Sequence, residues 1–289
     1  MRRALSVDAS IAASSAHDGL SQRDFRLLAE YIYNYSGIKM PDSKRTMLEG
    51  RLRKRLRATG HATFAQYCSF LFREDGLEEE AIYLIDVVTT NKTDFFREPN
   101  HFDYMEKFAL PALAGEGHGR IRAWSSACST GAEPYTMAMV LAEAAEKQVI
   151  NNFSILATDL STDVLRKAHS GIYARELLEP VPADMMRKYV MRSVDAGRRE
   201  VRIVPRLRSK IGFARLNLMD PTYQIGDAVH LLFCRNVLIY FDKKTQVHVL
   251  TQLCKRLVSG GYLFIGHSET ITGIDLPLRQ VANTVFKKQ

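Results

Sequence analysis

Hydrophobic residues recur at helical spacing through the first third of the chain. Leu48, Leu52 and Leu56, for example, lie four residues apart on one face. Four stretches are amphipathic in this way: 20–37, 43–60, 64–74 and 77–91. Ser21 is a candidate N-cap for the first stretch, and Gly37 is a candidate end. Since no strand alternation interrupts them, residues 20–90 are predicted to form a small all-helical domain.

Beyond residue 105 the pattern changes to short apolar runs that alternate with helical stretches. The runs expected as strands are 120–126, 153–160, 211–218, 228–236, 262–269 and 280–288. Such alternation predicts a mostly parallel sheet with right-handed crossovers. The run 228–236 is almost wholly apolar, which is typical of a central strand. We predict a Rossmann-like α/β domain over residues 106–289, joined to the helical domain by a linker at 91–105.

Residues 171–212 break this alternation. A proline-bounded helix is followed by the basic, alternating run 201–218, which is interpreted as a hairpin. An inserted small antiparallel β subdomain explains this stretch better than another βα unit. Its exposed edges would be able to accept a peptide strand from a partner. At the other end of the chain, residues 1–19 lack a sustained apolar core and are predicted to be a disordered tail.

A strand, a small-residue turn and a helix start are expected at RIRAWSSACSTGAEPY, residues 120–135. Ligands of open α/β sheets bind at such turns. The turn has the single glycine Gly131 where a dinucleotide fingerprint would have three, and Glu133 would repel a pyrophosphate. A cationic ligand such as S-adenosylmethionine would instead be attracted. Alternatively, Glu133 is only a first-turn residue favoured by the helix dipole.

Two further segments carry candidate ligand contacts. Asp159 ends the second predicted strand, where an acidic residue commonly binds ribose hydroxyls, although it is also placed to cap the next helix beside Ser161. The polar segment 89–102 joins the two predicted domains, a preferred location for ligand sites. By composition alone, that segment is equally an ordinary capped loop.

Composition restricts the class of protein and its partners. The 289 residues are 46% hydrophobic, no apolar run is long enough to span a bilayer, and membrane insertion is not expected. The four cysteines form no C-x-x-C pair, so neither a zinc site nor a disulfide framework is indicated, and a reduced cytoplasmic setting fits best.

The formal net charge is +8, and much of it gathers on one predicted helix. Its candidate partner-binding residues are Arg51, Arg53, Lys54, Arg55 and Arg57. Such a face is either simply solvated or a docking surface for an acidic partner. No nucleic-acid module is evident and few aromatic residues interleave with the charges, so a nucleic-acid partner is not expected.

Five motifs in order resemble a known family. They are T-N-x-T-x-F-F-R-E (90–98), S-T-G-A-E-P-Y (129–135), A-T-D-L (157–160), F-C-R-N-V-L-I-Y-F-D (233–242) and L-F-I-G-H-S-E (263–269). Together with the basic helix and the insertion, they resemble the chemotaxis receptor glutamate methyltransferases, the CheR family, from about residue 20 to the end. One departure is Ala132, where the family usually has a second glutamate.

The resemblance implies methyl transfer from S-adenosylmethionine to glutamate side chains of membrane chemoreceptors, giving methyl esters and S-adenosylhomocysteine without a metal. By motif position it implies cofactor contacts from Asn91, Thr93, Arg97, Glu133, Asp159, Asn217, Leu218, Arg235 and Asn236. It also implies a cytoplasmic monomer that is recruited to chemoreceptor arrays and docks on acidic receptor helices. Some members bind a receptor C-terminal peptide at the β subdomain, but the loop 193–200 lacks their several glycines.

The implied chemistry needs no general base, because a glutamate with an ordinary pKa is ionised at neutral pH. Orientation and removal of water are what the site has to supply. Arg97 is the candidate to bind the substrate carboxylate in a forked geometry, and Tyr240 to contact it or line the methyl path. Two rival interpretations stay open: a nucleic-acid methyltransferase, and a non-catalytic adaptor that senses the cofactor.

Overall fold

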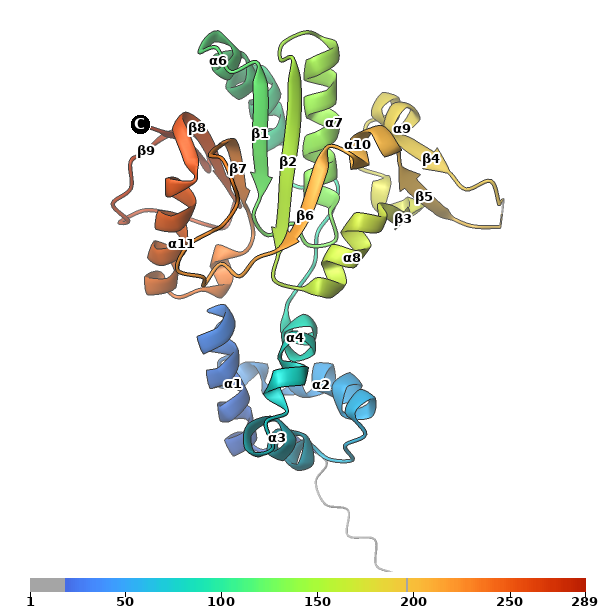
Figure 1. Ribbon diagram of the computed structural model, residues 1–289, viewed down its shortest axis with the longest axis vertical. Coiled ribbons are helices and arrows are strands. Elements are labelled where there is room, and N and C mark those ends of the chain that lie inside the picture. The colour runs from blue at the N-terminus through green and yellow to red at the C-terminus, as the bar shows by residue number, and fades with distance from the viewer. Residues whose placement is uncertain (1–18, 196) are drawn as a thin grey trace, which may run out of the picture.

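The computed structural model describes residues 19–195 and 197–289, and it has two parts (Figure 1). A helical domain lies against one end of an α/β domain. The predicted disordered tail, residues 1–19, lies outside the described residues except for Gly19. Within the described ranges, no helix is both long enough and apolar enough to cross a membrane.

The helical domain follows the predicted pattern closely. It contains α1 (Gln22–Ser36), η1 (Asp42–Lys44), α2 (Arg45–Thr59), α3 (Phe64–Arg73) and α4 (Leu77–Val88). The predicted cap is confirmed, since the Ser21 hydroxyl accepts a hydrogen bond from the Asp24 N–H, and Gly37 ends α1 with a φ of 72°. Leu48, Leu52 and other apolar side chains form a core of their own.

The chain then crosses to the α/β domain. A helical stretch follows, made of α5 (Asn100–Tyr104), η2 (Met105–Ala109) and α6 (Leu110–Gly115), so part of the predicted linker 91–105 is helical. The middle element, η2, has π-helical geometry. Pro111 is tolerated because it lies in the first turn of α6.

A seven-stranded sheet forms the centre of the α/β domain. Its strands are β1 (Arg120–Ser125), β2 (Asn152–Asp159), β6 (Ile211–Arg215), β7 (Val229–Cys234), β8 (Leu257–Ile265), β9 (Leu278–Ala282) and β10 (Val285–Lys288). They lie in the order β6-β2-β1-β7-β8-β10-β9. All adjacent pairs from β6 to β8 are parallel, and β10 pairs antiparallel with both β8 and β9. The predicted mostly parallel sheet is therefore confirmed.

The two faces of the sheet are covered by different helices. Ala123 on β1 belongs to the same core cluster as α7 (Ala132–Glu146), whereas its neighbour Trp124 packs with residues of α11 (Lys243–Lys255). This alternation is what a strand buried on both faces requires. The chain runs from β1 outward to β2 and β6, and then returns to the other side of β1 as β7. A ligand crevice is expected at that reversal, outside the carboxyl ends of β1 and β7. Figure 1 shows the helical domain at this end.

The insertion contains a small antiparallel sheet in the order β3-β5-β4, but the predicted hairpin is wrong. The insertion elements are β3 (Ile172–Ala174), η3 (Arg175–Leu178), α9 (Ala183–Tyr189), β4 (Val190–Arg192), β5 (Glu200–Ile203) and α10 (Pro205–Arg208). Pro205 starts a helical turn, which sends the chain away from β5. The strand after it, β6, joins the main sheet beside β2 and ends at Arg215, before Asn217 and Leu218.

The predicted C-terminal strands also need correction. The last predicted strand is two strands, because Thr284 has a φ of 55° and the chain reverses there to pair β9 with β10. The strand predicted at 262–269 begins earlier, because Gly260 and Gly261 lie within β8. The register of β8 against β7 shifts in this stretch, a local irregularity that glycine tolerates.

Candidate functional site

A pocket lies where the two domains meet. Its walls are the carboxyl ends of β1, β2 and β7, the linker after α4, and the segment that joins α1 to α2. Every residue predicted as a cofactor contact or catalytic group lines it: Asn91, Thr93, Arg97, Glu133, Asp159, Asn217, Leu218, Arg235, Asn236 and Tyr240. The tertiary structure thus brings together residues that are spread over 150 positions of sequence.

The turn at Gly131 places Glu133 at the start of α7. Gly131 has a φ of 94°, and a Cβ at this position would lie 2.8 Å from the Tyr173 hydroxyl oxygen, so only glycine fits. The Glu133 carboxylate accepts a hydrogen bond from the Ser125 hydroxyl at 2.7 Å, and it forms an ion pair with Arg235 Nη1 at 3.2 Å. Burial raises the pKa of Glu133, while Arg235 and Ser125 oppose the increase.

Arg235 is a buried residue of the pocket lining that pairs with two carboxylates. Besides Glu133, its guanidinium contacts Glu98 Oε2 at 3.0 Å through Nη2, and Nη2 also donates to the carbonyl of Arg97. The next residue, Asn236, has a φ of 58° and donates from Nδ2 to Glu98 Oε1 at 3.1 Å. Arg235 therefore ties the end of β7 to the linker and to the first turn of α7. Removal of either carboxylate would leave part of a buried cation unpaired.

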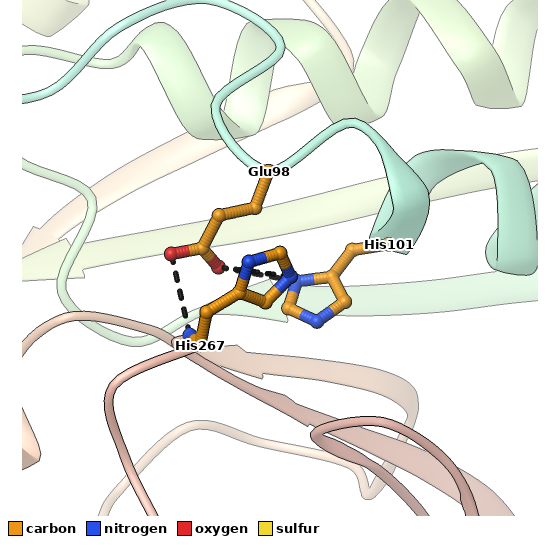
Figure 2. Close-up of side chains that lie close together, drawn as sticks. All are labelled: Glu98, His101 and His267. Carbon is orange, nitrogen blue, oxygen red and sulfur yellow. Dashed lines mark hydrogen bonds and ion pairs between the residues drawn. The ribbon is translucent and has the colours of Figure 1, made fainter.

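Glu98 is a site residue to which sequence reasoning assigned no role, although it ends the motif at 90–98. Figure 2 shows that its carboxylate faces two neighbouring histidines, His101 at the start of α5 and His267 after β8. Burial alone would raise the pKa of Glu98, but hydrogen bonds from Asn236 and the charge of Arg235 outweigh it and lower the pKa below its ordinary value. Glu98 is therefore ionised at neutral pH.

Asp159 helps to orient the start of α8 (Thr162–Ser170), one of the two roles that the sequence left open. Its Oδ1 accepts from the Ser161 N–H at 3.0 Å, and its Oδ2 accepts from the Ser129 N–H at 2.8 Å. Asp159 also lines the pocket. Burial raises the pKa of Asp159, and the two N–H groups counter this.

Side chains of the helical domain bind the segments that form the pocket walls. Asp86 on α4 accepts two hydrogen bonds of 2.8 Å from Thr162, one from its N–H and one from its hydroxyl. Arg51 on α2 donates to the carbonyl of Thr89 at 3.0 Å and to the Thr90 hydroxyl at 3.1 Å. Neither contribution follows from sequence spacing, because both partners lie far away in the chain. Arg51 thus anchors the linker that carries Asn91.

The remaining basic residues of α2 differ in their surroundings. Arg55 is paired with Glu80 at 2.6 Å. Arg53 pairs with Glu49 at 2.8 Å on the exposed side. Lys54 and Arg57 are exposed. The helix therefore presents a smaller free basic face than its composition indicates.

Contacts from α1 and the segment after it reach the pocket wall that carries Asn217 and Tyr240. Asn217 Nδ2 donates to the Tyr35 carbonyl at 2.6 Å, and the Lys39 N–H donates to the Tyr240 carbonyl at 3.1 Å. Tyr33 donates from its hydroxyl to Asp242 at 2.7 Å. These bonds join the helical domain directly to the segments that carry Asn217 and Tyr240.

Arg97 also lines the pocket, is half-buried and makes one side-chain hydrogen bond, from Nη1 to the Lys92 carbonyl at 3.1 Å. It is flanked by Phe96 and Glu98, which have φ values of 52° and 57°. Side chains other than glycine rarely adopt this backbone conformation, and such residues gather at functional sites.

Comparison with known proteins identifies the family. A model described as CheR methyltransferase, SAM binding domain matches residues 91–286, and one described as CheR methyltransferase, all-alpha domain matches residues 23–89. The chain belongs to the CheR methyltransferase family. The pocket lined by the ten predicted residues lies between these two matched regions, with walls from both.

Curated members of the CheR family are similar over nearly their full lengths. A chemotaxis protein methyltransferase of Borreliella burgdorferi is 36% identical, covering 93% of this chain and 95% of that protein. Chemotaxis protein methyltransferase 2 of Pseudomonas aeruginosa is 36% identical over 92% and 93% of the two chains. A chemotaxis protein methyltransferase of Salmonella typhimurium is 37% identical, covering 92% of this chain and 90% of that protein. The chain is therefore an S-adenosylmethionine-dependent methyltransferase of this family.

Proposed function

We propose that this chain transfers the methyl group of S-adenosylmethionine to glutamate side chains of membrane chemoreceptors, and that it does so from the cytoplasm as a monomer recruited to receptor arrays. The observation that carries the proposal is the pocket between the domains, which gathers all ten predicted residues. The printed names of the relatives, which are chemotaxis protein methyltransferases, support the substrate class.

The charges of the pocket suit this cofactor. S-adenosylmethionine carries a sulfonium and an ammonium group, and the carboxylates of Glu133 and Asp159 are both pocket-lining. We assign Asp159 to the ribose hydroxyls and Glu133 to the methionyl end, where Arg235 holds the carboxylate in place. The other assigned contacts are Asn91, Thr93, Arg97, Asn217, Leu218 and Asn236. A pyrophosphate-containing cofactor would meet two carboxylates and is disfavoured.

The methyl transfer is a direct displacement. A carboxylate oxygen of the substrate forms a bond to the methyl carbon, the carbon–sulfur bond breaks, and its electron pair stays on sulfur as S-adenosylhomocysteine forms. No proton moves, because the glutamate is already ionised. The protein has to orient the carboxylate and exclude water. Arg97 retains unpaired N–H donors for the substrate carboxylate. The hydroxyl of Tyr240, which also lines the pocket, is the second candidate contact.

Receptor docking is assigned to the basic helix α2. Lys54 and Arg57 are exposed, and they would meet an acidic receptor helix directly together with Arg53. Arg51 and Arg55 bind within the protein, so they would add mainly to the positive field. A receptor C-terminal peptide would pair with an edge of the small sheet, at β3 or β4, because β5 already has a partner on each side.

The test is transfer of labelled methyl from S-adenosylmethionine to chemoreceptor-containing membranes, followed by mild base. Label on the receptor that base removes is the expected result, because carboxyl methyl esters hydrolyse readily. Base-stable label, or label on added nucleic acid, would favour the nucleic-acid methyltransferase. Cofactor binding without transfer to any receptor tested would favour the non-catalytic adaptor.

A further inference from the structure

Three side chains from different segments converge beside the pocket. Glu98 Oε2 lies 3.5 Å from Nδ1 of His101 and 4.0 Å from Nε2 of His267, and the three atoms all lie within 4.8 Å of one another (Figure 2). Glu98 comes from the linker, His101 from α5 and His267 from the turn after β8. Two imidazoles and one carboxylate are a ligand set that zinc and similar ions prefer.

The surroundings of His101 make this arrangement unusual. Its Nε2 lies 2.8 Å from Thr284 Oγ1. His101 is 1% exposed, and its Nδ1 is buried without a hydrogen-bond partner. This nitrogen faces the carboxylate oxygen Oε2 of Glu98 at 3.5 Å.

A buried ring nitrogen without a hydrogen-bond partner costs free energy, because it has lost water and gained no contact in exchange. The Glu98 oxygen at 3.5 Å is too far away to satisfy it directly. A metal ion would satisfy both groups. The contact between His101 and Thr284 would then fix the ring for metal binding, as hydrogen bonds from metal-bound histidines commonly do.

The nearest cation opposes metal binding but does not block it. Arg235 Nη2 lies 3.0 Å from the same Glu98 oxygen, and Arg235 also pairs with Glu133. A third carboxylate, Glu269, is buried close by and accepts hydrogen bonds from the N–H groups of Asn236 and Gly266. Two carboxylates therefore pair with the guanidinium, and a third contacts the backbone of the next residue, Asn236. The Glu98 oxygen also has a second lone pair, directed away from the one that Arg235 uses.

We propose that Glu98, His101 and His267 bind one divalent transition-metal ion of the zinc type. The side chain of His267 is 38% exposed, so the ion would enter there and keep water in its remaining position. Ligand atoms 3.5 and 4.0 Å apart would need only a small rotation of His267 for all three to reach bonds of about 2.0–2.2 Å to one ion. The site is separate from the methyl transfer proposed above, which needs no metal, and it would link the linker to the turn after β8.

The experiment is titration of the untagged, metal-free full chain with Co²⁺, a spectroscopic substitute for Zn²⁺. One equivalent should give the visible absorption of a low-symmetry cobalt site, and Zn²⁺ should abolish it. Thiolate charge-transfer bands should be missing, because the cluster contains no cysteine and the four cysteines of the chain are buried elsewhere. The readout is independent of enzyme activity, so it does not depend on the proposed function.

His267→Ala is the decisive variant, because its exposed ring makes a folding defect less of a concern than at His101. We expect it to weaken Co²⁺ binding at least about tenfold, as removal of a metal ligand should. His169→Ala is the matched control, since His169 is an exposed histidine on α8 outside the cluster, and binding should stay unchanged. The proposal is overturned if the wild type shows no cobalt spectrum at one equivalent, or if His267→Ala binds as tightly as the wild type.

Discussion

Asp86 offers the sharpest test of how the two domains form one site. It is 8% exposed on α4, and its carboxylate accepts two hydrogen bonds of 2.8 Å from Thr162 at the N-terminus of α8. Asp159 lies only three residues before Thr162 in the same turn. Loss of the Asp86 carboxylate should therefore loosen the attachment of the helical domain and the turn that carries Asp159.

The magnitude follows from those two bonds. Hydrogen bonds to charged groups contribute about 1.5–3 kcal/mol each, and Thr162 is partly exposed, so the lower value applies to each bond. Asp86→Ala should then cost about 3 kcal/mol of unfolding free energy. For a chain of this size that corresponds to a fall in Tm of roughly 6–12 °C. Asp86→Asn retains one acceptor and should lose about half as much.

Thermal unfolding measured by circular dichroism gives the stability, and calorimetric titration with S-adenosylhomocysteine gives the affinity of the cofactor site. We expect Asp86→Ala to weaken that affinity and Asp86→Asn to restore most of it. Glu79→Ala is the control, because Glu79 is exposed on the same helix and should change stability by no more than about 0.5 kcal/mol. If Asp86→Ala were no less stable than this control, the reasoning from the two hydrogen bonds would be refuted.

Four further predictions concern other parts of the molecule. Arg97→Ala and Tyr240→Phe should each lower turnover by about tenfold or more, within the range for lost positioning groups; Arg97→Ala should also weaken cofactor affinity in calorimetry, whereas Tyr240→Phe should leave it near normal, and full turnover in both would contradict the roles proposed for them. Lys54→Glu should weaken methylation of receptor membranes and reduce its salt dependence, measured as initial rates at several ionic strengths. Gly131→Ala should abolish S-adenosylhomocysteine binding, because its Cβ would lie 2.8 Å from a buried hydroxyl oxygen; measurable affinity would show that the turn adapts. Burial lowers the pKa of His230 from 6.5 to about 4, and His118 and Arg122 lower it further. Because the unfolded chain then binds a proton that the folded chain does not, stability to urea should fall as pH drops from 6.5 toward 4, and His230→Asn should make that fall smaller.

Local patterns predicted most of the helices and strands. The leucines of α2 and the caps at Ser21 and Gly37 were readable because helix periodicity and capping depend on residues within one or two turns. The hairpin at 201–218 was wrong for a related reason. Alternation identifies a strand but does not specify its partner, and β6 pairs with β2, which lies more than 50 residues earlier.

The candidate site also contains residues that motifs could indicate and residues whose partners only the folded chain reveals. Glu133, Asp159 and Asn236 could be chosen from motifs, since each ends or begins an element at the edge where parallel strands meet. Glu98 and Asp86 could not be given roles, because their partners are Arg235 and Thr162, and no local rule connects positions so far apart. Arg51 was assigned to an outward docking face, whereas its guanidinium turns inward to the linker.

Most helices and strands, and the change of pattern between the two parts of the chain, could be predicted from short-range periodicity. The resemblance to the CheR family indicated ten of the residues that line the pocket. The pairing of charges could not be predicted, since Glu98, Glu133 and Arg235 meet through three separate segments. Nor could the buried His101 Nδ1 without a hydrogen-bond partner, because its surroundings include Thr284 at the far end of the chain. Burial and pairing are properties of the packed chain, and they set the chemistry of the site.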